Sequence, residues 1–456
     1  MTKRHLHTIL LTLTLTLLAG SGWAWQSAWG SGSWSPQGLR VWQGSAPVGD
    51  AYTAPIYGIH WDQSTNTMTQ GTVDRSTGEY TVGASSTWHV QEQLGRGLYV
   101  ASTDTFTKLD ATNSSLLDSG GAADLTGASG DVMVRIPRHY QLWHRSGDNQ
   151  YILLSEEPFE FDGQAAWVPL CFDDDAYYYI SAFEGVLDDN GVITTGTGSA
   201  GANTSEDKLR SLPDYKPWTA EFRSVYRTIS RNVGGTVHSL SWDAYQMLVA
   251  LMVTEWGSWD SQTELPGYTG ASSYNYNYVR QTGRTLHLGD ASGSVLSDLT
   301  GTDSDLSGIV GADEYVANSY RGIENVYGHS WKFLDGINID NTDGSCTVYT
   351  SADYTAFADD TATGYTDTGH APAFGDSGGW IADILGSGQH APLYPSSVGA
   401  NNLYDYHWNN SGGWRVLLAG GALANGGAAG VTYLNAHDGS GARSSLLGAR
   451  LAARGN

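Results

Sequence analysis

The segment from Trp414 to Leu451 constrains the fold of this 456-residue chain more than any other. It opens with the apolar run Trp414-Arg-Val-Leu-Leu-Ala-Gly-Gly421 and closes with Leu447-Gly-Ala-Arg-Leu451. Small and polar residues with almost no hydrophobic periodicity lie between these two runs. Such a stretch is poorly suited to building a core and well suited to a solvent-facing surface. The segment therefore predicts two scaffold strands with exposed loops between them.

Before this segment, the hydrophobic period changes from that of strands to that of helices. Residues 132–136 alternate in polarity, and residues 177–182 form a strongly β-prone run. Shorter β-prone runs, which also predict strands, lie at 57–61, 97–101, 151–154 and 158–161. Apolar residues recur at helical spacing in 220–230 and 242–256, which predicts two helices.

The length of the chain exceeds one ordinary core and indicates two or three domains. A polar stretch of Gly, Thr, Ser, Asn and Asp at 185–206 is typical of a linker or exposed loop. We predict an α+β chain divided into an N-terminal apolar segment at 1–24, a β-rich region at 25–125, a β-sheet segment with the linker at 126–205, and a last domain at 206–456 that contains a variable region at 414–451.

The N-terminal segment has the pattern of a signal peptide. Lys3 and Arg4 precede an apolar run at 9–18, and Gly22-Trp23-Ala24 provides a small-x-small end. We therefore expect cleavage after Ala24 and export to the cell surface or the periplasm. The alternative is a buried helix at the start of a phage tail protein. No later stretch approaches the ~20 apolar residues of a membrane-spanning helix, so we expect no span after processing.

A formal net charge of −24 disfavours nucleic acid and anionic membranes as partners. We expect a protein, a glycan or another cell-surface ligand instead. Oligomerisation of the chain would raise a modest affinity by avidity and is left open.

The variable region resembles the variable proteins of diversity-generating retroelements, which include phage tropism determinants and exported bacterial surface proteins. The resemblance is carried by Trp414-Arg-Val, Gly420-Gly421 and Leu447-Gly-Ala-Arg-Leu451. It extends to Ser319-Tyr-Arg-Gly-Ile-Glu-Asn325 and Tyr327-Gly-His-Ser-Trp-Lys-Phe-Leu-Asp-Gly336 and covers residues 130–451. It implies a C-terminal C-type-lectin-like domain, related in fold to formylglycine-generating enzymes, that is preceded by β-rich N-terminal domains. The function implied is ligand or receptor recognition without catalysis.

In that family, mutagenesis of template adenines turns asparagine codons into mixtures that never encode Lys, Glu, Gln, Met or Trp. The window 422–447 lacks all five of these residues. Position by position, the resemblance implies nine varied, ligand-binding positions: Ala424, Asn425, Ala428, Asn435, His437, Asp438, Ala442, Ser444 and Leu446. Among them Asn425, His437 and Leu446, with the fixed Tyr433, offer the most contact area.

Two enzymatic readings compete with this one. Gly375-Asp-Ser-Gly-Gly379 matches the nucleophile motif of trypsin-like serine hydrolases, with Ser377 as the nucleophile. However, His60, His89, His139 and His144 lack the sequence context of a catalytic histidine in that family, and a turn before a strand explains the glycines. A formylglycine-generating oxidase needs paired cysteines near the end of the chain, whereas the last cysteine is Cys346.

Cofactors are not expected, although three acidic runs leave Ca²⁺ open. These runs lie at 173–175, 188–189 and 359–360, and carboxylates are the hard oxygen ligands that Ca²⁺ prefers. Acidic runs are more often solvated loops. Cys171 and Cys346 permit one disulfide after export, but their sequence positions do not establish it.

Overall fold

The computed structural model describes residues 52–83, 88–197, 202, 204–271, 273–297, 315–372 and 378–455, and the short pair β1 (Ser33–Trp34) and β2 (Arg40–Val41). Strands dominate these ranges, so the chain is β-rich. The segment 1–24, which the sequence predicts to be a signal peptide, lies outside the described residues.

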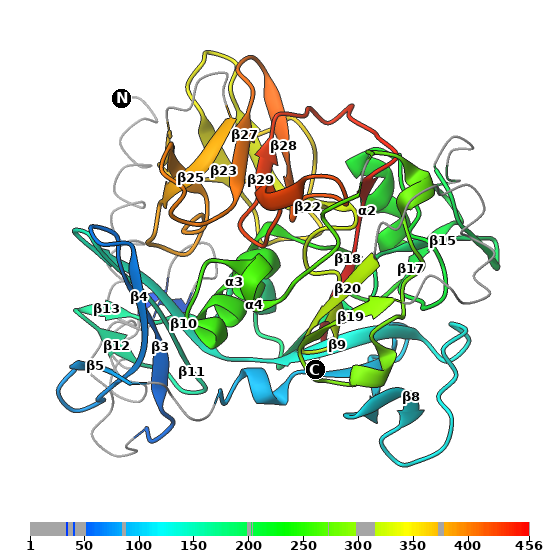
Figure 1. Ribbon diagram of the computed structural model, residues 1–456, viewed down its shortest axis with the longest axis horizontal. Coiled ribbons are helices and arrows are strands. Elements are labelled where there is room, and N and C mark those ends of the chain that lie inside the picture. The colour runs from blue at the N-terminus through cyan, green and yellow to red at the C-terminus, as the bar shows by residue number, and fades with distance from the viewer. Residues whose placement is uncertain are drawn as a thin grey trace, which may run out of the picture.

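A five-stranded antiparallel sheet contains the first described strands (Figure 1). Its order is β10 (Tyr140–Ser146), β11 (Asn149–Ser155), β3 (Ile56–Asp62), β4 (Thr67–Val73) and β5 (Tyr80–Val82). Successive residues of β11 point to opposite faces of the sheet. Ile152 and Leu154 pack in the main core, whereas Leu153 packs in a smaller cluster with Phe159 and Phe161. The hairpin β12 (Glu160–Phe161) and β13 (Gln164–Ala165) brings Phe161 to this outer face.

A seven-stranded sheet joins strands from all three regions that follow the N-terminal segment. Its order is β18 (His238–Ser239), β31 (Leu451–Gly455), β14 (Tyr177–Ser181), β9 (Asp131–Pro137), β6 (Gly95–Val100), β7 (Thr105–Asp110) and β8 (Asn113–Leu117). The alternation at 132–136 correctly predicts β9. Because Met133 and Val134 are both buried, the sheet is covered on both faces there.

The third large sheet carries the variable region. Its strands are β22 (Trp331–Asp340), β23 (Thr347–Thr350), β24 (Thr366–Asp367), β25 (Gly378–Ile384), β26 (Pro395–Val398), β27 (Tyr406–Asn409), β28 (Trp414–Ala419), β29 (Leu434–Ala436) and β30 (Leu447–Gly448). They follow the order β24-β23-β22-β28-β29-β27-β25-β26, and β30 pairs in parallel with β22. Two smaller sheets contain β15 (Val186–Asp189), β16 (Val192–Thr194) and β17 (Lys208–Arg210), and β19 (Gly293–Ser297), β20 (Tyr315–Tyr320) and β21 (Ile323–Glu324).

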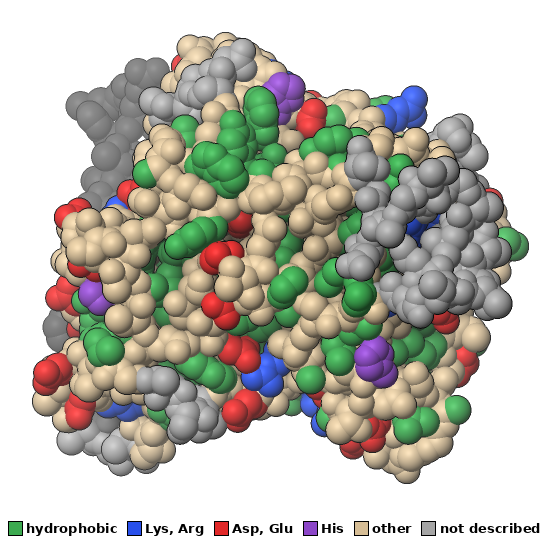
Figure 2. All heavy atoms as spheres, viewed as in Figure 1, with side chains coloured by type: hydrophobic (Ala, Val, Ile, Leu, Met, Phe, Trp, Pro, Cys, Tyr) green, Lys and Arg blue, Asp and Glu red, His purple; other side chains and the backbone are tan. Residues whose placement is uncertain are grey.

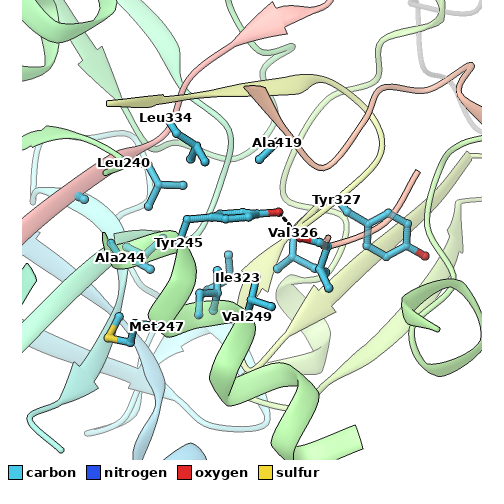
Figure 3. Close-up of a cluster of buried hydrophobic side chains, with 14 of the residues drawn as sticks. Leu240, Ala244, Tyr245, Met247, Val249, Ile323, Val326, Tyr327, Leu334 and Ala419 are labelled. Carbon is cyan, nitrogen blue, oxygen red and sulfur yellow. Dashed lines mark hydrogen bonds between the residues drawn. The ribbon is translucent and has the colours of Figure 1, made fainter. Parts of the chain in front are cut away.

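The two helices predicted from periodicity are confirmed as α2 (Arg223–Arg231) and α3 (Trp242–Trp256), and the short α4 (Ser261–Glu264) follows. The Ser241 hydroxyl accepts a hydrogen bond from Ala244 N–H at the start of α3, and Gly257 ends it with φ of 66°. Residues 242–253 of α3 are all buried, because the helix lies between the sheets in the middle of the molecule (Figure 1). In Figure 3, Tyr245 of α3 lies among Leu240, Leu334 and Val326.

The predicted linker at 185–206 differs from what the structure shows. Its first half forms the antiparallel hairpin β15–β16, and β15 also pairs with β17. Val186 is fully buried and Leu187 is 5% exposed, and because consecutive strand residues lie on opposite faces, β15 is covered on both faces there. Because most residues of the stretch are polar, a prediction based on average polarity misses the strand that contains this pair.

The two cysteines are not joined. Cys171 and Cys346 are both buried and free, so the disulfide that the sequence permits is not formed. In the described part of the chain, no helix is both long and apolar enough to cross a membrane.

Candidate functional site

The variable region begins and ends on the scaffold strands that the sequence predicts. The strand β28 pairs with β22 on one side and β29 on the other, and β29 pairs in parallel with β27. At the far end, Trp331 and Lys332 of β22 lie opposite Leu447 and Gly448 of β30. Both ends of the region are therefore fixed to one sheet, which restricts the loops between them.

A glycine pair turns the chain out of β28. Gly420 and Gly421 have φ of 88° and 75°, in the left-handed region that side chains disfavour. A Cβ atom added to Gly421 would lie 2.8 Å from the Cβ of Ala429, so the turn also needs the space. The Gly420 N–H donates to the Tyr433 carbonyl at 2.9 Å. The pair thus folds the following loop back onto the sheet.

Much of the region after this turn is buried, contrary to the prediction of an open loop surface. Leu423, Val431 and Leu434 are fully buried, and Tyr433 is only 2% exposed. Leu446, one of the nine predicted varied positions, is also 2% exposed, so little of its side chain is accessible. These side chains pack beneath the loops because the loops fold over β22 and α4 rather than extending into solvent.

Five of the nine predicted varied positions nevertheless line one surface pocket of about 400 Å³. They are Asn435, Asp438, Ala442, Ser444 and Leu446. Tyr274 and Trp331, from outside the variable region, complete the wall together with Arg443. We call this pocket the variable-region pocket.

Asn425 is connected to the variable-region pocket through Tyr274. The Asn425 Nδ2 donates to the Tyr274 hydroxyl at 2.9 Å, and its Oδ1 accepts from the Ala422 N–H at 2.7 Å. Ala424 and Ala428 flank it, and both are partly exposed. This loop therefore forms a second group of varied positions beside the pocket.

His437 is the one aromatic residue among the nine predicted varied positions and lies at the edge of an aromatic group. Its side chain is 48% exposed, and its ring meets that of Trp408 edge-on at 6.0 Å. Trp408 is itself 41% exposed and packs against Tyr406 at 5.6 Å. His437 thus borders the aromatic pair Tyr406 and Trp408 on β27.

Trp408, Tyr406 and Tyr274 are contributors that sequence reasoning missed. Tyr406 and Trp408 alternate along β27, which places them on one face of a strand. Tyr274 begins the alternating run Tyr274-Asn-Tyr-Asn-Tyr278 and is 58% exposed. Alternating aromatics in short polar runs are the signal that indicates them.

A buried carboxylate anchors the loop from beneath. Both the N–H and the hydroxyl of Thr432 donate to Asp405 Oδ2, at 2.8 and 2.6 Å. Asp405 is 1% exposed, and burial raises the pKa of Asp405 to about 7. At Gly430 an added Cβ would lie 2.1 Å from Asp405 Oδ1, so only glycine lets the backbone approach this closely.

The Tyr327–Gly336 motif is structural. Its His329 and Lys332 face the buried Glu184, and Ser330 Oγ donates to Glu184 at 2.5 Å. Burial alone would raise the pKa of Glu184, but His329 and Lys332 hold it well below its usual range. Burial in turn lowers the pKa of Lys332 to about 8. This network joins β22 to the segment after β14.

Each of the three acidic runs contains a carboxylate that pairs with arginine. Asp173 contacts Arg454 at 3.0 Å, and Asp188 contacts Arg210 at 3.1 Å. Asp359 contacts both Arg223 and Arg227 at 2.6 Å. Among the residues that the structure describes, no group of three or more His, Cys, Asp or Glu is placed to hold a metal ion.

The residues of the serine-hydrolase hypothesis are scattered over the structure or lie outside the described ranges. Ser377 lies outside them, and Gly378 and Gly379 begin β25. His60 and His144 lie on the outer face of the five-stranded sheet, where they contact Asn149 and Asp162. His139 is buried against the Pro137 carbonyl.

Comparison with known proteins found no match for this chain, either among protein-family models or among curated proteins.

Proposed function

We propose that the chain is a ligand- or receptor-binding protein whose recognition surface is the variable-region pocket and the adjoining loop of Asn425. We further propose that its last domain is C-type-lectin-like and that a retroelement diversifies the varied positions. The observation that carries the proposal is the gathering of Asn435, Asp438, Ala442, Ser444 and Leu446 around one pocket.

The support is physical as well as positional. Side chains at Ser444 and His437 are exposed, whereas the chain on either side is held by β28, β29 and β30. Substitutions at exposed positions on a rigid frame change the surface with little cost to stability. Fixed Tyr274 and Trp408 supply large aromatic area, which small varied residues such as Ala442 do not. This division allows one scaffold to present many surfaces.

The genomic test is the neighbouring DNA. We expect a reverse-transcriptase gene and a near-copy of the segment that encodes residues 414–451, differing only at adenines. Strain differences should cluster in the codons of the nine varied positions. If no such copy exists and differences fall at other bases, retroelement diversification fails.

Recognition itself can be tested by display selection. A library randomised at Asn435, His437, Asp438, Ala442 and Ser444 should yield folded binders against unrelated protein targets. A library of equal size at exposed positions of the distant β15–β16 hairpin, such as Asp189 and Val192, provides the matched control. Equal yields from the two libraries would remove the special role of the variable-region pocket.

A further inference from the structure

A second pocket, of about 680 Å³, opens on the outer face of the five-stranded sheet. It lies between the turns of three hairpins, β4–β5, β10–β11 and β12–β13, which Figure 1 shows at one end of the molecule. Its lining residues are Thr77, Gly78, Tyr80, Ser146, Asn149, Tyr151, Glu160, Phe161, Asp162 and Gly163. We call it the hairpin pocket. It shares no residue with the variable-region pocket.

The floor of the hairpin pocket is aromatic. Tyr151 lies directly opposite His144 on β10 and His60 on β3 in the strand register. Its ring stacks on His60 at 4.7 Å with an interplanar angle of 17°, and on His144 at 6.2 Å with 24°. Phe161 closes one side at 4.8 Å from Tyr151. Three strands and a hairpin thus combine into one aromatic surface.

Tyr80 extends this floor across β4. Its hydroxyl donates to the Thr69 carbonyl at 2.9 Å, and its ring lies edge-on to Tyr151 at 5.6 Å. A Cβ added to Gly71 would lie 2.6 Å from Tyr80 Cζ, so the ring crosses the strand where there is no side chain. The glycine therefore fixes the position of Tyr80 beside His60.

The rim is polar and partly held in place. Asn149 Oδ1 lies 2.7 Å from His60 Nε2, and Asp162 Oδ2 lies 2.9 Å from His144 Nε2. The Asp162 side chain is 61% exposed, while that of His144 is 12% exposed, so the histidine holds a carboxylate that still faces solvent. Glu160 is also exposed at the rim. Amide and carboxylate oxygens accept hydrogen bonds from hydroxyl groups.

We propose that the hairpin pocket binds a neutral glycan. A sugar ring presents an apolar C–H face to aromatic side chains and hydroxyl groups to polar acceptors, which matches an aromatic floor with an amide and carboxylate rim. None of the ten lining residues, all within the described ranges, is Lys or Arg, and two are acidic, so the pocket disfavours anionic ligands. The site goes beyond the proposed function and does not depend on it.

The test uses the full chain on an array of neutral, sialylated and sulfated oligosaccharides. Titration calorimetry with the neutral oligosaccharide that binds best then follows. Asn149→Ala and Asp162→Ala change exposed side chains and should each raise the dissociation constant about tenfold or more. Tyr80→Ala should have the same effect. Glu79→Gln, at a neighbouring exposed carboxylate outside the lining, should leave the affinity unchanged, whereas Asp438→Asn reports on the variable-region pocket.

Three results would overturn the proposal. The first is that no neutral oligosaccharide binds. The second is that binding occurs but is unaffected by Asn149→Ala and Asp162→Ala. The third is that tetramethylammonium chloride binds at low salt but not at high salt and is not displaced by the neutral oligosaccharide, because aromatic rings with carboxylates also attract cations. A loss of binding in Asp438→Asn alone would assign the glycan to the variable-region pocket instead.

Discussion

Asp243 provides the sharpest test of how burial controls the stability of this protein. It lies in the first turn of α3 and is 4% exposed, and both of its carboxylate oxygens are buried without a hydrogen-bond partner in the described structure. Burial raises the pKa of Asp243 from 3.8 to about 8, and Arg454 offsets only part of this effect. At pH 7 the folded protein therefore holds Asp243 protonated, whereas the unfolded chain ionises it.

The raised pKa determines how stability depends on pH. Below pH 3.8 Asp243 is protonated in both the folded and the unfolded protein. As the pH rises from 3.8 towards 8, the unfolded chain loses this proton while the folded protein keeps it, so the free energy of unfolding falls. Each pH unit in this window costs roughly 1.4 kcal/mol, so the loss by pH 7 is on the order of 4 kcal/mol. Asp243→Asn keeps the shape and cannot ionise, and the variant should therefore gain stability over the natural protein as the pH rises.

The assay is thermal or urea unfolding of both proteins at pH 4, 5, 6, 7 and 8. We expect the two to be similar at pH 4 and Asp243→Asn to be the more stable by several kcal/mol at pH 7. The buried Asp405, with a pKa near 7, is common to both proteins and cancels in the difference. Asp189→Asn, at an exposed carboxylate, is the matched control and should show no such trend. A difference between Asp243→Asn and the natural protein that stays constant from pH 4 to pH 8 would refute the reasoning.

Three further predictions concern the variable region and its support. Gly430→Ala places a Cβ about 2.1 Å from Asp405 Oδ1 and should cost about 1–3 kcal/mol of unfolding free energy. Gly427→Ala, with open space around the added Cβ, should be nearly neutral. Similar melting temperatures for the two variants would contradict this prediction. Leu446→Ala should cost about 2–5 kcal/mol in denaturant titration and Ser444→Ala less than about 0.5 kcal/mol, although both are predicted varied positions. A mild effect of Leu446→Ala would mean that the loop opens in solution. Glu184→Gln removes the charge that faces His329 and Lys332 and should cost about 3–5 kcal/mol at pH 7. Because the pKa of Glu184 is held below 4.5, the ionised carboxylate stabilises the folded protein above that pH, and this stabilisation is lost as the pH falls. The loss of unfolding free energy in Glu184→Gln should therefore become smaller in acid. A loss that does not change with pH would exclude this charge effect.

Local patterns predict the elements that their own residues dictate. The alternation at 132–136 gives β9, and the helical spacing at 242–256 gives α3 with the same bounds. The apolar run at 414–421 gives β28, and the glycine pair at its end turns the chain because it occupies the left-handed region. The run at 447–451 is divided between β30 and the start of β31. These features depend on neighbours a few residues apart in sequence.

The candidate site was predictable only in part. Five varied positions taken from the sequence gather at one pocket, but Tyr274 and Trp331 join them from more than 80 residues away. Leu446 and Tyr433 looked like contact residues, yet they are buried because the loop folds over β22. Average polarity was misleading at 185–206 because other segments of the chain cover both faces of β15 and bury Val186 and Leu187.

The sequence by itself determined the strands β9 and β14, the helices α2 and α3, and the strand β28 that opens the variable region. Only the tertiary structure decided which small residues are exposed, which arginine neutralises each acidic run, and how three hairpins combine into the hairpin pocket. Periodicity specifies the face of an element on which a side chain lies. Whether that face meets solvent depends on segments distant in sequence, which no local pattern encodes.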